Sequence, residues 1–289
     1  MTMLLALVAA ITAQAAQTPP PPADTAAATQ DTDDIVVTAR MRDRARDTAR
    51  RVEAALPPTT IEQPLARFTD PICPGVVGMA RASGQAVVDR IGIVADMLGL
   101  KVGAPGCDPN LLVIATADGR ALVRRMMARR PANIQAQTLA DLRRILAEPG
   151  GARAWVEWEV RNRDGQRAMP QNDGPPTLAV QGSSRIVSAI RRDIVSAIVV
   201  IDTAALAGHD PVQIADYAAM RALADARPAR IGDTASILTA FTPAAAAPAT
   251  LTPFDLGLLR GLYKGQGNVT AGMKRAMMVR EIVAAPPEG

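Results

Sequence analysis

The chain has 289 residues, of which 48% are hydrophobic but only 2% aromatic, and its formal net charge at pH 7 is +4. This length is enough to bury a sizeable core, as one large domain or two small ones. Because the chain offers few aromatic rings for stacking on bases, and no ribbon of mixed basic and aromatic residues, the composition argues against a nucleic-acid partner.

The first residues predict export. A short apolar run at residues 3–11 is followed by Ala13-Gln14-Ala15, a small-x-small cleavage site, although no Lys or Arg precedes the run. The run is too short to span a bilayer, and no Cys follows it to carry a lipid anchor. We therefore expect residues 1–15 to be a signal peptide. The mature protein is expected to be soluble, without a transmembrane span, and periplasmic or secreted.

Residues 16–66 are predicted to be a disordered tail that contains an Arg-rich helix. The segment 17–34 is mostly Pro, Ala, Thr and Asp without periodicity, which is typical of disorder. Ile35, Val36 and Val37 interrupt it, and with the following Thr-Ala-Arg they resemble the short N-terminal segment of TonB-dependent outer-membrane receptors. The resemblance implies an extended strand offered to an envelope protein; a plain short strand or linker is the alternative.

The Arg-rich helix is expected at residues 40–56, before Pro57-Pro58. Asp43 and Asp47 lie three or four residues before Arg side chains, a spacing that pairs opposite charges on a solvated helix face. Binding of this face to an anionic surface is the alternative.

Cys73 and Cys107 are the only cysteines, and each lies in a turn rich in Pro and Gly. An even pair in an exported protein predicts a disulfide. The alternatives are free thiols or a metal pair, but the chain has no Cys-x-x-Cys motif and its only histidine is His209.

Residues 67–285 are expected to form a single α+β domain with a small mixed or antiparallel sheet and helices at both ends. The periodicities predict helices at 79–100, 119–130, 138–147, 234–241, 252–263 and 270–284, another from residue 211, and strands at 111–116, 152–163 and 194–202.

Several segments are expected to lie outside these elements, or to be ambiguous. Residues 75–78 follow a Cys turn rather than a strand, so their two glycines do not form a nucleotide-binding loop. Residues 162–182 are expected to be a loop. Residues 186–190 recur as 194–198, which suits two adjacent strands or one bulged strand. Trp155 falls on the polar face of its strand, where a neighbouring loop covers it or it lines a binding surface.

The stretch from Asp193 to Ala226 predicts the centre of the fold: a buried strand, a short turn and a helix that starts at Pro211. Asp210 is the expected N-cap, and Gln213 is expected to close a capping box.

The segment from His209 to Gln213 looks like a degenerate zinc-peptidase helix. Gln213 replaces the second His ligand, Asp210 replaces the catalytic Glu, and Pro211 disfavours a helical Asp210. We therefore expect His209 to precede the helix without facing Gln213, and we expect no metal and no cofactor.

Asp216 lies among apolar residues on the helical wheel, so its carboxylate must be paired, hydrogen-bonded or shifted in pKa. One interpretation is structural: Asp216 accepts N–H groups from a neighbouring helix start or pairs with an Arg. The other is functional, with Asp216 as a polar group in a cleft.

Three segments carry a family resemblance: Asn110–Val113 (NLLV), Gln213–Arg221 (QIADYAAMR) and Leu258–Tyr263 (LLRGLY). They resemble a group of uncharacterised exported bacterial proteins and, more distantly, a zincin-like domain of unknown function. The resemblance covers residues 67–282 and implies a degenerate zincin-like scaffold. The family's metal ligands do not carry over, because this chain lacks them.

These observations predict a non-catalytic binding or envelope-associated protein. The alternative is a peptidase-like hydrolase that uses the carboxylate of Asp216 or Glu157 in a cleft. Gln213 is a further polar candidate at the same helix.

Overall fold

The computed structural model describes residues 32–129, 134, 137–182, 184–228, 232–243 and 247–285, and for residues 32–39 it describes the backbone alone. The predicted signal peptide and the tail up to residue 31 lie outside these residues. The chain divides into two units, residues 1–40 and 41–289. The second unit contains the predicted α+β domain.

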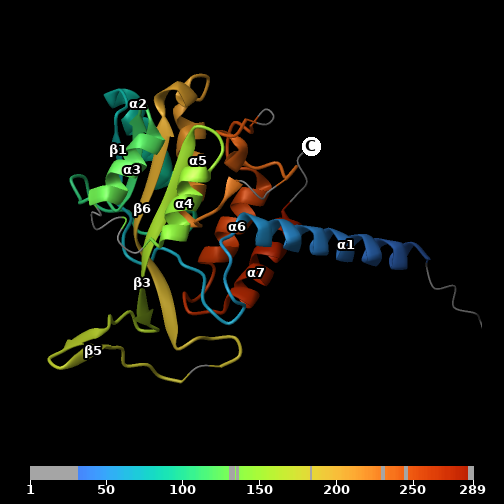
Figure 1. The fold of residues 1–289 in the computed structure, drawn as a ribbon. Coiled ribbons are helices and arrows are strands. Elements are labelled where there is room, and N and C mark those ends of the chain that lie inside the picture. The colour runs from blue at the N-terminus through green and yellow to red at the C-terminus, as the bar shows by residue number, and fades with distance from the viewer. Residues whose placement is uncertain are drawn as a thin grey trace, which may run out of the picture. The chain divides into compact units, whose positions relative to one another are not determined.

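Four strands form a mixed sheet in the order β1-β2-β6-β3, which confirms the α+β class (Figure 1). β1 pairs with β2, and β2 with β6, in the parallel direction, whereas β3 pairs with β6 in the antiparallel direction. A separate antiparallel hairpin of β4 and β5 lies at the lower end of β3 and β6 in Figure 1. The strand bounds are β1 Pro74–Val77, β2 Leu111–Thr116, β3 Ala152–Asn162, β4 Met169–Gln171, β5 Gly174–Thr177 and β6 Ile190–Asp202.

The structure adds detail to the predicted strands and corrects one predicted loop. Residues 75–77, for which no element was predicted, belong to β1, because β2 beside them supplies the parallel hydrogen-bonding partner. The expected loop at 162–182 contains the β4–β5 hairpin. Of the two alternatives for the repeated segment, the bulged strand is found, and it holds the second copy. Residues 194–198 lie in β6, where the register shift opposite Glu157 and Trp158 leaves Val195 as an extra residue, whereas residues 186–189 precede β6.

Seven α-helices complete the described fold: α1 Thr32–Ala55, α2 Arg81–Met97, α3 Gly119–Arg129, α4 Leu139–Ala147, α5 Pro211–Leu223, α6 Pro253–Tyr263 and α7 Ala271–Ala284. The backbone of Ile35, Val36 and Val37 lies in α1, so the expected extended strand is wrong. The predicted ion pairs of Asp43 and Asp47 with arginines three and four residues later are formed. None of the helices in the described ranges is long and apolar enough to cross a membrane.

The helix starts follow the capping residues of the sequence. The Asp210 side chain accepts a hydrogen bond from the Gln213 N–H at 2.8 Å, ahead of Pro211 at the first helical position. Thr252 and Asp255 form a reciprocal capping box at the start of α6. The box expected between Asp210 and Gln213 does not form, because the Gln213 amide is engaged elsewhere.

The sheet is covered on both faces. α5 packs on one face with α2, and alanines at 215, 218, 219 and 222, all at most 1% exposed, let it lie close to its neighbours. α3 and α4 cover the other face, where Trp155 is 1% exposed and packs among their apolar side chains. Trp155 is therefore a buried core residue, covered by α3, α4 and Ile134 from the segment between them, and not an exposed part of a binding surface.

α6 and α7 approach one another closely because two glycines face the partner helix. A Cβ at Gly261 would lie 2.4 Å from the Met278 Cα, and one at Gly257 would lie 2.8 Å from the Ile282 N. Their spacing of four residues places both on one face of α6, so any side chain there would force the helices apart.

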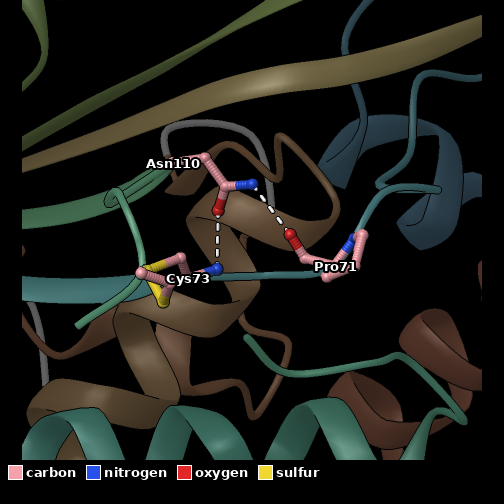
Figure 2. Close-up of a disulfide and its surroundings, with 4 residues drawn as sticks. Pro71, Cys73 and Asn110 are labelled. Carbon is pink, nitrogen blue, oxygen red and sulfur yellow. Dashed lines mark hydrogen bonds between the residues drawn. A yellow bond between two sulfur atoms is a disulfide. The ribbon is translucent and has the colours of Figure 1, made fainter. Parts of the chain in front are cut away.

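The disulfide between Cys73 and Cys107 is formed, with the two Cα atoms 6.0 Å apart (Figure 2). It joins the start of β1 to the loop that leads into β2. Asn110 holds the same segment: its Oδ1 accepts from the Cys73 N–H at 2.8 Å, and its Nδ2 donates to the Pro71 carbonyl at 2.9 Å. Because β1 is short and lies at the edge of the sheet, these bonds secure its position.

Replacing both cysteines by Ser should lower the free energy of unfolding by about 3–4 kcal/mol, because the link closes a loop spanning 34 positions and restricts the unfolded chain. Denaturant melts of Cys73→Ser/Cys107→Ser, compared with oxidised and reduced wild-type protein, measure this loss. The reduced wild type serves as the matched control. Thiols that alkylate freely without reductant would contradict the pairing.

Candidate functional site

Asp216 is a fully paired structural carboxylate. It is 0% exposed, and Arg90 on α2 binds it in a bidentate pair, with Nε at 2.7 Å and Nη2 at 2.9 Å. The Thr250 hydroxyl and the Leu251 N–H, which precede α6, donate to Oδ2 at 2.5 and 3.0 Å. Both partners named by the structural interpretation, an arginine and an N–H at a helix start, are present, so Asp216 joins α5 to α2 and α6.

Gln213 also serves a structural contact. Its Nε2 donates to the Pro248 carbonyl at 2.7 Å, and its Oε1 lies 2.6 Å from Nδ1 of His209. His209 precedes the helix as expected, but the expectation that the two side chains do not face one another is wrong. The contact forms because the turn before Asp210 folds the imidazole back over the first turn of α5.

Glu157 lies on the other side of the sheet. It is 4% exposed, and its Oε1 accepts from Gln137 Nε2 at 3.1 Å. Two residues earlier on β3, Trp155 faces α3 and α4, whereas Asp216 belongs to the helix on the opposite face. The structure therefore does not bring the two candidate carboxylates together, as a pair acting on one substrate would require.

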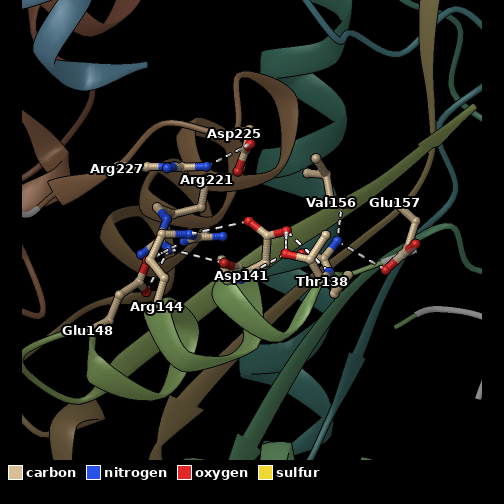
Figure 3. Close-up of polar contacts among 11 residues, drawn as sticks. Thr138, Asp141, Arg144, Glu148, Val156, Glu157, Arg221, Asp225 and Arg227 are labelled. Carbon is tan, nitrogen blue, oxygen red and sulfur yellow. Dashed lines mark hydrogen bonds and ion pairs between the residues drawn. The ribbon is translucent and has the colours of Figure 1, made fainter. Parts of the chain in front are cut away.

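A buried ion pair joins α5 to the end of α4. Arg221 Nη2 binds both carboxylate oxygens of Glu148, at 2.9 and 2.8 Å, and Arg221 Nη1 donates to the Tyr217 hydroxyl at 2.5 Å (Figure 3). Arg221 Nη2 also lies 3.4 Å from the carbonyl of Ala154 on β3. These contacts fix the C-terminal turn of α5 against α4 and the edge strand.

A cleft of about 310 Å³ lies beside this ion pair. It is bounded by the start of α4, the residues after α5, the segment after α1 and parts of β3 and β6. Its lining residues are Pro57, Pro58, Thr59, Ala66, Gln137, Thr138, Asp141, Arg144, Val156, Trp158, Arg192, Asp225 and Arg227. Figure 3 shows the α4 side of this cleft, with Arg144 and Asp141 on the helix and Asp225 and Arg227 above it in the view.

Three guanidinium groups line the cleft, from Arg144, Arg192 and Arg227. Arg192 stacks on the ring of Trp158, 4.5 Å from Cζ to the ring centroid, and its Nη2 donates to Gln63. The Arg227 guanidinium makes a long ion pair with Asp225, 3.9 Å between Nη2 and Oδ2. The cleft therefore has positively charged groups beside the indole of Trp158, a residue that is 39% exposed.

Asp225 has the least usual backbone in the described chain. Its φ of +49° makes it the single non-glycine residue with positive φ among the residues described. It follows the C-cap of α5, where Gly or Asn is usual, and Asp tolerates the left-handed conformation better than most residues. Burial raises the pKa of its carboxyl to about 6, against the opposing effect of Arg227, Arg144 and Arg221. An ionisable group shifted toward neutral pH inside a cleft marks a candidate site.

The arrangement is suited to binding an anion. Within the described ranges, no group of three or more His, Cys, Asp and Glu side chains is placed to hold a metal ion. The cleft offers guanidinium donors and an apolar wall, the features that orient a small charged ligand in a concave site.

Comparisons with known proteins do not assign this fold to a family: no protein-family model, curated protein or solved structure matches the chain significantly.

Sequence patterns alone did not single out this cleft as a site. Its arginines are far apart in the chain, and only the folded sheet brings them together. One signal was available: the Ala-Asp-Ala that follows α5 places an acid at the position where a helix ends in a left-handed residue.

Asp216→Ala should lower the free energy of unfolding by about 3–5 kcal/mol, because it leaves Arg90 and the Leu251 N–H without their buried acceptor. Asp216→Asn keeps an acceptor oxygen and should cost less. Denaturant melts compare both with Asp89→Ala, an exposed acid next to Arg90, expected within about 0.5 kcal/mol of wild type. A stabilised Asp216→Ala would contradict the structural assignment.

Asp225→Asn should stabilise the protein at pH 7.5 by about 1–3 kcal/mol, with the difference vanishing near pH 4. The folded-state pKa of about 6 lies above the ordinary value of 3.8. The folded state therefore binds the proton more tightly, and wild-type stability falls as pH rises from about 4 to 6. Asn removes the titration and is accepted at positive φ. Denaturant melts of the wild type and of Asp225→Asn between about pH 4 and 7.5 measure this difference in the free energy of unfolding. If the free energies of the two proteins change with pH in parallel, the raised pKa of Asp225 is contradicted.

Proposed function

We propose that this chain is an exported, non-catalytic binding protein, and that the cleft lined by Arg144, Arg192 and Arg227 holds a small anionic ligand. The observation that carries the proposal is the clustering of three guanidinium groups on one concave surface beside Trp158. Guanidinium groups recognise carboxylates and phosphates through paired hydrogen bonds.

The state of the buried carboxylates supports binding over catalysis. Asp216 has four donor contacts from Arg90, Thr250 and Leu251, and Asp255 accepts from Ser236, Thr252 and the Ile237 N–H. Carboxylates saturated in this way hold elements together, and they are poorly placed to exchange protons with a substrate.

Export is supported by the disulfide, since such bonds persist in oxidising compartments. It is further supported by the apolar leader with its Ala-Gln-Ala site. The resemblance to exported bacterial proteins on a degenerate zincin-like scaffold agrees with a binding role that has lost its metal ligands. Association with an envelope protein through Ile35, Val36 and Val37 belongs to the same proposal; because their backbone is helical, that partner would bind a helix rather than add a strand.

The alternative function is hydrolysis by a carboxylate in a cleft. Glu157 is its best candidate, because Gln137, which binds it, lines the cleft with Arg144. Hydrolysis of a peptide or ester panel that is lost in Glu157→Gln would favour this alternative and contradict a non-catalytic role.

The binding proposal is tested by thermal melts of the chain starting at residue 16, at pH 5.5, with benzoate, succinate and inorganic phosphate. At least one anion should raise the melting temperature by several degrees, as mass action requires for ligand well above its Kd. Benzamide and glucose are the uncharged controls. Arg227→Gln should abolish the shift.

Arg163→Gln is the matched control, because Arg163 is half exposed, pairs only loosely with its neighbour Asp164 and does not line the cleft. It should respond like the wild type. A panel without any stabilising anion, or a shift that survives Arg227→Gln, would overturn the proposed function.

A further inference from the structure

The two acids of the cleft differ in how they are held. Asp141 is engaged in the capping box of α4, where its Oδ2 lies 2.6 Å from the Thr138 hydroxyl. The Asp225 carboxylate receives no hydrogen bond from any described residue, and its ion pair with Arg227 is 3.9 Å long. Asp225 is therefore the acid that is free to change its charge when a ligand enters.

Charged groups reach Asp225 from each element around it. Arg221 comes from α5, Arg227 from the segment after α5, and Arg144 from α4, while Glu148 follows α4. Three cations and one anion thus face this carboxylate, yet burial dominates and raises its pKa to about 6. Glu148 binds both Arg221, at 2.8 Å, and Arg144, at 3.4 Å. Arg227, whose ion pair with Asp225 is 3.9 Å long, is therefore the most weakly paired of the three cations and the one best able to receive a ligand.

Part of the cleft lining is apolar. Pro57, Pro58, Ala66, Val156 and Trp158 contribute to its lining. A volume of about 310 Å³ is at the lower end for small-molecule sites and fits one ring with a short substituent. A compact anion such as phosphate would pair with the guanidinium groups but would leave the apolar lining residues exposed to water.

We infer that the cleft binds an amphipathic carboxylate, with the ligand carboxylate on Arg227, the apolar body against Trp158 and the prolines, and a proton taken up by Asp225. This inference rests on the proposed function and deepens it. The proton comes from solvent: the Asp225 carboxylate becomes a neutral carboxyl, its ion pair with Arg227 ends, and the ligand carboxylate replaces it without placing two anions side by side.

The prediction is tested with benzoate as probe, by isothermal titration of the chain starting at residue 16 at pH 5.5 and 7.5. Benzoate should bind about fivefold or more tightly at pH 5.5, because the binding-competent, protonated form of Asp225 is then the major one. Titration at pH 6.5 in two buffers of different ionisation enthalpy should show proton uptake. Benzamide, which has the same ring without the charge, should bind much more weakly.

Asp225→Asn keeps the shape of the side chain and is well accepted at positive φ, so its fold should be retained. Its benzoate affinity should be independent of pH and close to that of the wild type at pH 5.5, whereas Arg163→Gln should keep the wild-type pH dependence.

Equal wild-type affinity at both pH values, or unchanged pH dependence in Asp225→Asn, would overturn proton coupling through Asp225. Failure of benzoate where succinate or phosphate stabilises the protein would overturn the ligand class and leave the proposed function standing. If no anion of the panel raises the melting temperature, the proposed function itself is overturned.

Discussion

The buried ion pair between Arg221 and Glu148 is the interaction on which the cleft depends. The two side chains are 2% and 5% exposed, so removing either one would strand a charge in the core, at a cost of about 3–5 kcal/mol. The pair ties the end of α5 to the end of α4. Asp225 and Arg227 follow directly after α5, and Arg144 lies one turn before Glu148, so this single contact sets the distance across the cleft.

α5 shows how polar groups can specify a core made largely of alanine and aliphatic side chains. Every residue from 213 to 223 is buried, and the polar ones are each tied to a different neighbour: Gln213 to Pro248, Asp216 to Arg90 and Arg221 to Glu148. Apolar packing alone would allow α5 to slide or rotate against its neighbours. Directional hydrogen bonds and ion pairs at three positions along the helix fix its position and its rotation.

Much of the fold follows from local patterns in the sequence. The caps at Asp210 and Thr252, the strand before α5 and the cysteine pair could be predicted because each depends on nearby residues or on compartment. β1 could not, since its four residues are a strand only beside β2. The cost of burying a charge predicts that Asp216 has an arginine or N–H partner. It does not predict that the partner is Arg90, which lies 126 positions away in the chain. The cleft could not be predicted either, because its arginines come from separate parts of the chain and only the folded sheet brings them together.

The outer edge of β3 has one further consequence. β3 is the last strand of the sheet, with β6 on one side only, so its outward carbonyl groups could pair with a strand from another molecule. Two of them are occupied by side chains: the Ala154 carbonyl by Arg221 and the Val156 carbonyl by Gln137 at 2.9 Å. Arg221 and Gln137 therefore occupy two of the edge carbonyls that a further strand would need, so this part of β3 is closed to edge-to-edge pairing.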